Sequence, residues 1–392
     1  SSAFGAQLAA QLGLGYAFAS HFAPQMLEHA ARLYREHFEP SEALAEPHFI
    51  AAANVIAADT EEVAEREWQA AQRARIRMML GRGRTLTDDE KAASLSPPRT
   101  KCCRPAPPVL VFDQAGTLIR SWGGPGEGYD WPQNEHGIHI DHKGFVWLAG
   151  NGDTDGQILK FTADGHFVLQ IGKQGPQTNS LDTTRLGKPA AMQVDPETNE
   201  LYVADGYFNH RVIVFDAETG AFKRMWGAYG KPPTDETLPA YDPAAAPAQQ
   251  FRNPVHCVQI ARDGLVYVCD RTNDRVQVFR RDGSFVKEFF VEKNTRANGS
   301  VWELALWPDA EQSYLLNADG ANNEVRTLSR ETGEVLGAFG RNGRMAGDFH
   351  WVHNLAVDSH GNVFTTEVDT GKRAQKFLFR GDMILRKRAA LP

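Results

Sequence analysis

The sequence predicts an all-β, six-bladed β-propeller over residues 109–392, preceded by a mainly helical α/β segment over residues 1–95 and a proline-rich linker over residues 96–108. Three observations support this fold class. One pattern of short strands recurs roughly every 40–60 residues after Val109. The part before it has the apolar periodicity of helices. The segment LSPPRTKCCRPAPP separates the two, because closely spaced prolines continue neither a helix nor a sheet.

The front segment alternates short apolar strands with amphipathic helices. Apolar residues at i, i+3, i+4 and i+7 predict helices over residues 26–38 and 61–80. Each helix follows an apolar stretch, residues 14–20 and 47–59, which we interpret as a strand. The order is therefore β-α-β-α, a pattern typical of α/β folds.

The propeller repeat consists of an alternating strand, a tight turn, an apolar strand that ends near Asp, an N-x-R-V-x-V-F strand and an outer strand. It is clearest in residues 203–227 and 268–290. A single small sheet of this kind cannot bury both faces, so the units must stack around an axis. Five whole blades are predicted to begin at about His136, Ala190, His256, Trp302 and His353.

The first blade lacks its inner half, because residues 109–123 supply only two outer strands. We expect one of two outcomes. Either residues 49–58 (FIAAANVIAA) act as a replacement strand, or the ring stays open with an exposed sheet edge.

Three histidines occupy the same position of three repeats: His136, His256 and His353. The intervening copies carry Ala190 and Trp302 there, so the histidines belong to alternate blades of the ring. Inner strands line the central channel of a propeller, and three imidazoles around one axis form a ligand set typical of catalytic zinc. The alternative is that histidine is simply tolerated in a wet channel. His139, on the same strand as His136, is interpreted as a face residue rather than a ligand.

Residues of about 101–392 resemble the peptidylglycine α-amidating lyase family, a branch of the NHL-repeat propellers. The family's zinc-binding histidines match His136, His256 and His353, and its active tyrosine matches Tyr207 in DGYFNHR. Its two active arginines match Arg271 in DRTNDR and, in a degraded motif, Arg104. The resemblance implies a zinc enzyme that cleaves a C-terminal α-hydroxyglycine into a peptide amide and glyoxylate, or a lyase for a related small carbinol. Its partner would be a peptide C-terminus or a small molecule.

Two departures from the family pattern affect this interpretation. The acidic residue that follows the third histidine, associated with a structural calcium, is replaced by Asn354, so a calcium site stays an open alternative that this position does not support. Phe208 stands where a disulfide cysteine would follow the active tyrosine. Tyr207 could instead be an aromatic residue that only packs at a turn. Arg271 could instead be part of the repeat scaffold, the role that we assign to Arg211 and Arg275.

Two other functional classes remain open. One is a non-enzymatic NHL-propeller scaffold whose histidines are inert or hold a structural ion, and the missing half blade favours it. The other is a lactonase-like metal hydrolase, which would need carboxylate ligands. Asp and Glu are absent from the three ligand positions.

Residues 1–100 resemble the C-terminal part of luciferase-like flavin monooxygenases, through SSAFGAQLAAQLGLGYAFASHFAP and EPHFIAAANVIAADTEEVAE. In that family such a segment forms only the last strands and helices of a (β/α)₈ barrel. A fraction of a barrel cannot close around a flavin, so flavin is not expected here.

Composition sets wider bounds. The formal net charge of −7 leaves no basic footprint for nucleic acid, and the apolar runs are too short for a membrane span. The chain does not begin with Met, so export after removal of a leader is one expectation, while the compartment stays open. Cys257 and Cys269 lie on neighbouring predicted strands; buried thiols are expected, and a cross-strand disulfide is the alternative.

Overall fold

The computed structural model describes residues 3–14, 16–19, 27–41, 44–47, 49–52, 108–114, 116–368 and 371–380. The chain divides into two compact units, Ser1–Pro107 and Pro108–Pro392. Within the described ranges, no helix is long and apolar enough to cross a membrane.

The first unit contains two short helices and a two-stranded parallel sheet. In chain order the elements are α1 (Ala3–Gln11), β1 (Tyr16–Ala19), α2 (Leu27–Glu36) and β2 (Phe49–Ala52). The strands β1 and β2 pair in register from Tyr16↔Phe49 onward, which requires the crossover that α2 supplies. Both predicted strands and the first predicted helix are therefore present. The second predicted helix, residues 61–80, lies outside the described residues.

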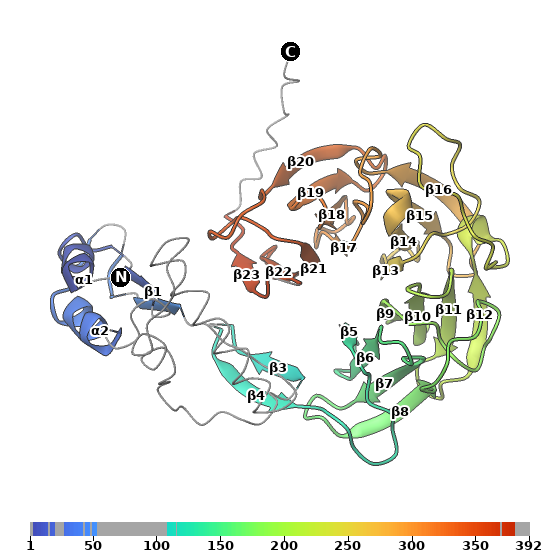
Figure 1. Cartoon of the computed structure of the whole chain (residues 1–392), viewed down its shortest axis with the longest axis horizontal. Coiled ribbons are helices and arrows are strands. Elements are labelled where there is room, and N and C mark those ends of the chain that lie inside the picture. The colour runs from blue at the N-terminus through green and yellow to red at the C-terminus, as the bar shows by residue number, and fades with distance from the viewer. Residues whose placement is uncertain are drawn as a thin grey trace, which may run out of the picture. The chain divides into compact units, whose positions relative to one another are not determined.

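The second unit is mostly β-propeller, with the described strands arranged in six antiparallel sheets around a common centre (Figure 1). We number them in chain order. Sheet 1 contains β3 (Val109–Phe112) and β4 (Leu118–Trp122). Sheet 2 contains β5 (Glu135–Ile140), β6 (Val146–Gly150), β7 (Gln157–Phe161) and β8 (Phe167–Gly172). Sheet 3 contains β9 (Ala191–Asp195), β10 (Glu200–Asp205), β11 (Arg211–Asp216) and β12 (Phe222–Trp226).

The remaining sheets continue the same order. Sheet 4 contains β13 (Val255–Ile260), β14 (Val266–Asp270), β15 (Arg275–Phe279) and β16 (Phe285–Phe290). Sheet 5 contains β17 (Glu303–Leu306), β18 (Tyr314–Asp319), β19 (Glu324–Ser329) and β20 (Val335–Phe339). Sheet 6 contains β21 (Val352–Val357), β22 (Val363–Glu367) and β23 (Ala374–Phe377). Five whole blades were expected; four sheets have all four strands, and the fourth strand expected for sheet 6 lies outside the described residues.

Hydrophobic cores fill the spaces between neighbouring sheets. Val258 and Ile260 of β13 pack on Tyr202 and Ala204 of β10, which joins sheet 4 to sheet 3. Equivalent cores join sheets 2 and 3, sheets 4 and 5, and sheets 5 and 6. The inner strands β9, β13, β17 and β21 therefore bury their alternate apolar residues against the second strand of the preceding sheet.

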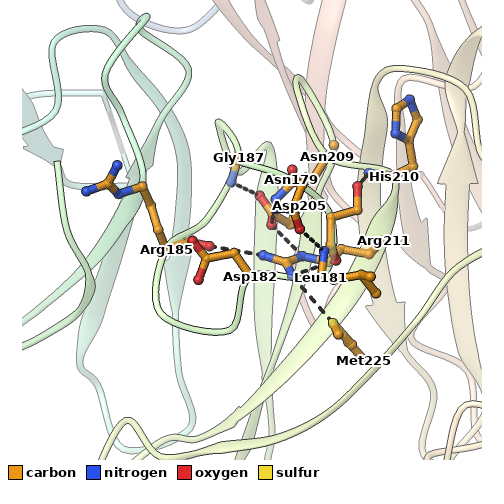
Figure 2. Close-up of polar contacts among 12 residues, drawn as sticks. Asn179, Leu181, Asp182, Arg185, Gly187, Asp205, Asn209, His210, Arg211 and Met225 are labelled. Carbon is orange, nitrogen blue, oxygen red and sulfur yellow. Dashed lines mark hydrogen bonds and ion pairs between the residues drawn. The ribbon is translucent and has the colours of Figure 1, made fainter. Parts of the chain in front are cut away.

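A buried aspartate–arginine pair fixes the loop between β10 and β11, where Figure 2 shows its contacts. Arg211 Nε and Asn209 Nδ2 both donate to Asp205 Oδ2, each at 2.8 Å. The backbone N–H of Gly187 donates to the other oxygen of Asp205 at 2.7 Å. The residues between Asp205 and Asn209 are thus held at both ends, and Tyr207 lies among them. Asp270 and Arg275 make the same pair in sheet 4, which supports a scaffold role for both arginines.

The first sheet is short of strands, in agreement with the repeat pattern. Among the described residues it contains only β3 and β4, and it packs on sheet 2 through a core that includes Val109, Leu148 and Phe161. Of the candidate replacement segment, the described residues Phe49–Ala52 form β2 and pair with β1 instead. Its other residues lie outside the described part of the chain.

Candidate metal centre

A β-bulge places each of the three histidines at the start of an inner strand. His256 is the extra residue between Val255, which pairs with Asp270, and Cys257, which pairs with Cys269. His136 and His353 lie in equivalent irregularities of β5 and β21. The inner strands β9 and β17, which follow Ala190 and Trp302, pair without such a shift. A bulge turns a side chain out of the regular alternation, so it can aim these imidazoles at the centre of the ring.

The three imidazoles lie together. One ring nitrogen of each is within 4.8 Å of the others, and their ring centroids are 4.8–5.3 Å apart. His136 Nδ1 lies 2.8 Å from the carbonyl of Ala190, and His256 Nδ1 lies 2.5 Å from that of Trp302. An N–H at Nδ1 leaves the Nε2 lone pair available, the usual way a protein orients a histidine ligand. Ala190 and Trp302 occupy the histidine position in the intervening repeats. Their backbone carbonyls therefore orient His136 and His256.

Burial keeps these histidines neutral. Desolvation lowers the pKa of His136 to about 4 and that of His353 to about 3, and holds the pKa of His256 well below its ordinary value. The positive charge of Arg271 acts in the same direction on all three pKa values. Neutral imidazole is the form that binds a metal ion, so at neutral pH the cluster is ready to accept one. This donor set fits a metal ion.

Tyr207 places its hydroxyl group among the imidazoles. Its oxygen lies 2.9 Å from His136 Nε2 and 3.1 Å from His256 Nε2. Arg271 Nη1 donates to the same oxygen at 3.4 Å. Burial is the largest influence on the Tyr207 hydroxyl and raises its pKa, while Arg271 lowers it; the net result is a raised pKa. The hydroxyl group is therefore protonated at neutral pH.

Trp302 forms one wall of the centre, a role that the sequence did not indicate. The guanidinium of Arg271 lies 4.4 Å from the Trp302 ring centroid, and the His353 ring lies 5.4 Å away, edge to face. The indole N–H donates to the carbonyl of Gly299 at 2.7 Å. Trp302 thus holds Arg271 by a cation–π contact and His256 through its carbonyl. In the sequence, the only feature that could have indicated this role is that an aromatic residue occupies the histidine position of its repeat.

Other residues singled out in the sequence lie as follows. His139 is outside the cluster and accepts a hydrogen bond from the Val194 backbone, while burial lowers its pKa to about 4. Arg104 lies outside the described residues. Asn354 follows His353 in β21 and is partly buried.

The expectation of buried thiols was wrong. Cys257 and Cys269 form a disulfide between β13 and β14. They are paired directly across the ladder with their Cα atoms 4.8 Å apart, a separation that permits the bond. The disulfide joins the residue after His256 to the strand that leads to Arg271.

Comparison with known proteins supports two separate similarities. The chain is 32% identical over 238 residues to peptidyl-glycine alpha-amidating monooxygenase A of Xenopus laevis, which covers 58% of this chain and 23% of that protein. It is 29% identical over 185 residues to NHL repeat-containing protein 3 of Mus musculus, covering 45% of this chain and 46% of that protein. Both resemblances inferred from the propeller repeats are therefore confirmed as partial homology.

A third match is short. The chain is 49% identical over 81 residues to a luciferase-like monooxygenase of Escherichia coli strain K12, covering 21% of this chain and 24% of that protein. The chain thus spans about a quarter of the two monooxygenases and about half of the NHL protein. No family model matches the chain.

Proposed function

We propose that this protein is a zinc-dependent lyase that cleaves a C-terminal α-hydroxyglycine, or a related small carbinol, into an amide and an aldehyde product such as glyoxylate. The observation that carries the proposal is the cluster of three neutral, buried histidines with a tyrosine hydroxyl group between them and an arginine beside it. The partial homology to an amidating monooxygenase supports the same chemistry. In this proposal the six sheets are the six blades of the ring, the first one incomplete.

His136, His256 and His353 would hold the zinc ion. A bound zinc ion supplies positive charge that lowers the pKa of an oxygen ligand. The nitrogen donors, their neutrality and the carbonyl contacts at Nδ1 suit zinc better than the oxygen-seeking calcium. Calcium therefore has no role in the proposal, and neither has flavin.

Tyr207 would transfer the proton, and Arg271 would bind the substrate carboxylate. Collapse of the carbinolamide breaks the C–N bond, turns the hydroxyl carbon into an aldehyde, and moves one proton from the hydroxyl oxygen to the departing amide nitrogen. The protonated Tyr207 hydroxyl can give a proton to that nitrogen and take one from the substrate hydroxyl, so one residue completes the transfer. The planar guanidinium of Arg271 suits the substrate carboxylate, and its position on Trp302 orients it. Arg104 would contribute a second cation.

The scaffold alternative has one observation in its favour. Sheet 1 has only two described strands, whereas sheets 2–5 each have four. A non-enzymatic propeller could hold the metal as a structural ion.

The test is release of glyoxylate from a short peptide that ends in α-hydroxyglycine, measured with zinc and with a chelator. We expect chelator-sensitive release that is abolished in His256→Ala and reduced roughly 100-fold or more in Tyr207→Phe. His142→Ala, which changes an exposed histidine on the turn after β5, is the matched control. Metal content measured on the same samples separates the outcomes: zinc without release contradicts the lyase alone, and neither zinc nor release contradicts both.

A further inference from the structure

In the part of the chain that the structure describes, the ring has an open slot between sheet 6 and sheet 2, beside the inner edge of β3. Ile138 and Ile140 of β5 line one wall, with 55% and 65% of their surface exposed. The residues at the same repeat positions of β13, Val258 and Ile260, are 1% and 7% exposed. Because Val258 and Ile260 pack on the second strand of the preceding sheet, the exposed isoleucines mark where such a strand is missing.

The opposite wall of the slot shows the same deficit. Phe364 of β22 is 37% exposed, whereas its counterpart Tyr202 of β10 is fully buried against sheet 4. Thr366 is exposed, and its counterpart Ala204 is fully buried. Two apolar walls thus face a space that neither of them fills.

The outer side of the slot is a sheet edge. In sheet 3 the second strand β10 pairs with β11 along its whole length, from Glu200↔Asp216 to Asp205↔Arg211. β3 is the counterpart of β11, and no strand among the described residues pairs with its inner edge. Leu110 and Phe112 of β3 are 45% and 52% exposed. An unpaired edge between apolar walls is a template for added strands.

We propose that this slot binds a β-hairpin supplied by another polypeptide, with the pattern of the inner half of a propeller blade. The other sheets define its chemistry: two antiparallel strands as long as those of Ala191–Asp205, with apolar residues at alternate positions and a polar turn. Sheets 2, 4 and 6 carry the histidines and sheets 3 and 5 do not, so a hairpin without histidine fits the alternation.

A partner polypeptide is favoured over the described residues that precede sheet 1. The described residues before sheet 1 form their own parallel sheet and their own core, which includes Ala6, Tyr16 and Tyr34. The chain also carries an 81-residue match to a luciferase-like monooxygenase, and the sequence resemblance places it in this front segment. The inference does not depend on the proposed lyase activity, because it uses only inter-sheet packing and strand pairing.

The experiment titrates the full chain with a synthetic peptide of sequence AAMQVDPETNELYVAD, which copies residues 190–205, by calorimetry and hydrogen exchange. We expect saturable one-to-one binding and slowed amide exchange in β3. A control peptide with Met192→Ser, Val194→Ser and Tyr202→Ser should bind at least roughly tenfold more weakly, because it loses apolar residues from both faces of the hairpin.

Protein variants locate the binding site. Ile138→Glu and Phe364→Glu should each weaken peptide binding roughly tenfold or more. Val168→Glu changes an apolar residue on β8, 43% exposed and away from the slot, and should leave binding unchanged.

Three results would overturn the proposal. The first is the absence of binding. The second is slow exchange in β3 of the protein alone, which would show that the chain itself fills the slot. The third is a concentration-dependent dimer abolished by Ile138→Glu, which would show that a second copy fills it.

Discussion

Within the described residues, the ring has a closed side and an open side built from the same repeat. Between sheets 3 and 4, Val258 and Tyr202 are almost completely buried, whereas their counterparts at the open slot, Ile138 and Phe364, are 55% and 37% exposed. The residue types are similar, so the difference comes from the neighbours that each wall meets. Burial in a propeller is therefore a property of the pair of sheets, not of the strand.

The sharpest test of this comparison is the same substitution on both sides. Val258→Asp places a carboxylate in a closed core and should lower the free energy of unfolding by about 4 kcal/mol or more. Ile138→Asp, at the same repeat position, should change it by no more than about 0.5 kcal/mol. Urea unfolding of the two variants measures both values. Equal losses would mean that the slot is filled in solution.

A second contrast concerns the acid–arginine pairs. Arg211→Met leaves Asp205 buried without its cation, and we expect a loss of about 3–5 kcal/mol. Arg373→Met in sheet 6 should cost less, about 1–2 kcal/mol, because the Arg373 side chain is 25% exposed and water can reach the guanidinium side of its pair with the buried Glu367. Chemical denaturation compares them directly. A larger loss for Arg373 would mean that the open side carries more of the stability than its packing suggests.

Metal binding joins the two sides, because His256 lies on the closed side while His136 and His353 come from the sheets that flank the slot. We expect His256→Ala and His353→Ala each to weaken zinc binding by about 100-fold or more, since each removes one of three ligands. Competition with a chromophoric chelator measures the affinity. His139→Ala should leave it nearly unchanged, and a comparable loss there would show that the ligand set has been misassigned.

The smallest expected effect is a pH dependence on the closed side. Burial raises the pKa of Glu303 to about 8, above its value of about 4.5 in the unfolded chain. Between pH 4.5 and pH 8 the unfolded chain binds fewer protons at this group than the folded chain, so Glu303 makes stability fall as pH rises. Glu303→Gln should flatten this slope and gain on the order of 1–3 kcal/mol at pH 8. Thermal unfolding at pH 5 and pH 8 measures it; an unchanged slope would contradict the assignment.

Much of this fold followed from the repeat pattern. Alternation and the N-x-R-V-x-V-F pattern located the strands, and the shortage at residues 109–123 predicted that sheet 1 has fewer described strands than sheets 2–5. The register of His136, His256 and His353 predicted their convergence, because equivalent positions of alternate sheets point to one axis. The apolar stretches of the front segment predicted its strands β1 and β2, whereas the helix α1 was not predicted.

Other features depended on distances that a one-dimensional pattern does not contain. The disulfide required Cys257 to face Cys269 across the ladder, and only the register shift at His256 decides that pairing. Burial outweighs the charge of Arg271 and raises the pKa of Tyr207, a balance that depends on the packing around its hydroxyl group. The sequence predicted no functional role for Trp302. Its backbone carbonyl contacts His256 and its ring contacts Arg271, and neither contact can be inferred from a repeat pattern.

The sequence by itself determined the order of the sheets, the scaffold arginines Arg211 and Arg275, and the set of imidazoles, because these follow from local periodicity and repeated spacing. Only the tertiary structure decided which apolar residues are buried, how the imidazoles are turned and which strand edge is left open. The physical reason is that burial, ligand orientation and edge pairing are set by neighbouring sheets, whose residues are far apart in the chain.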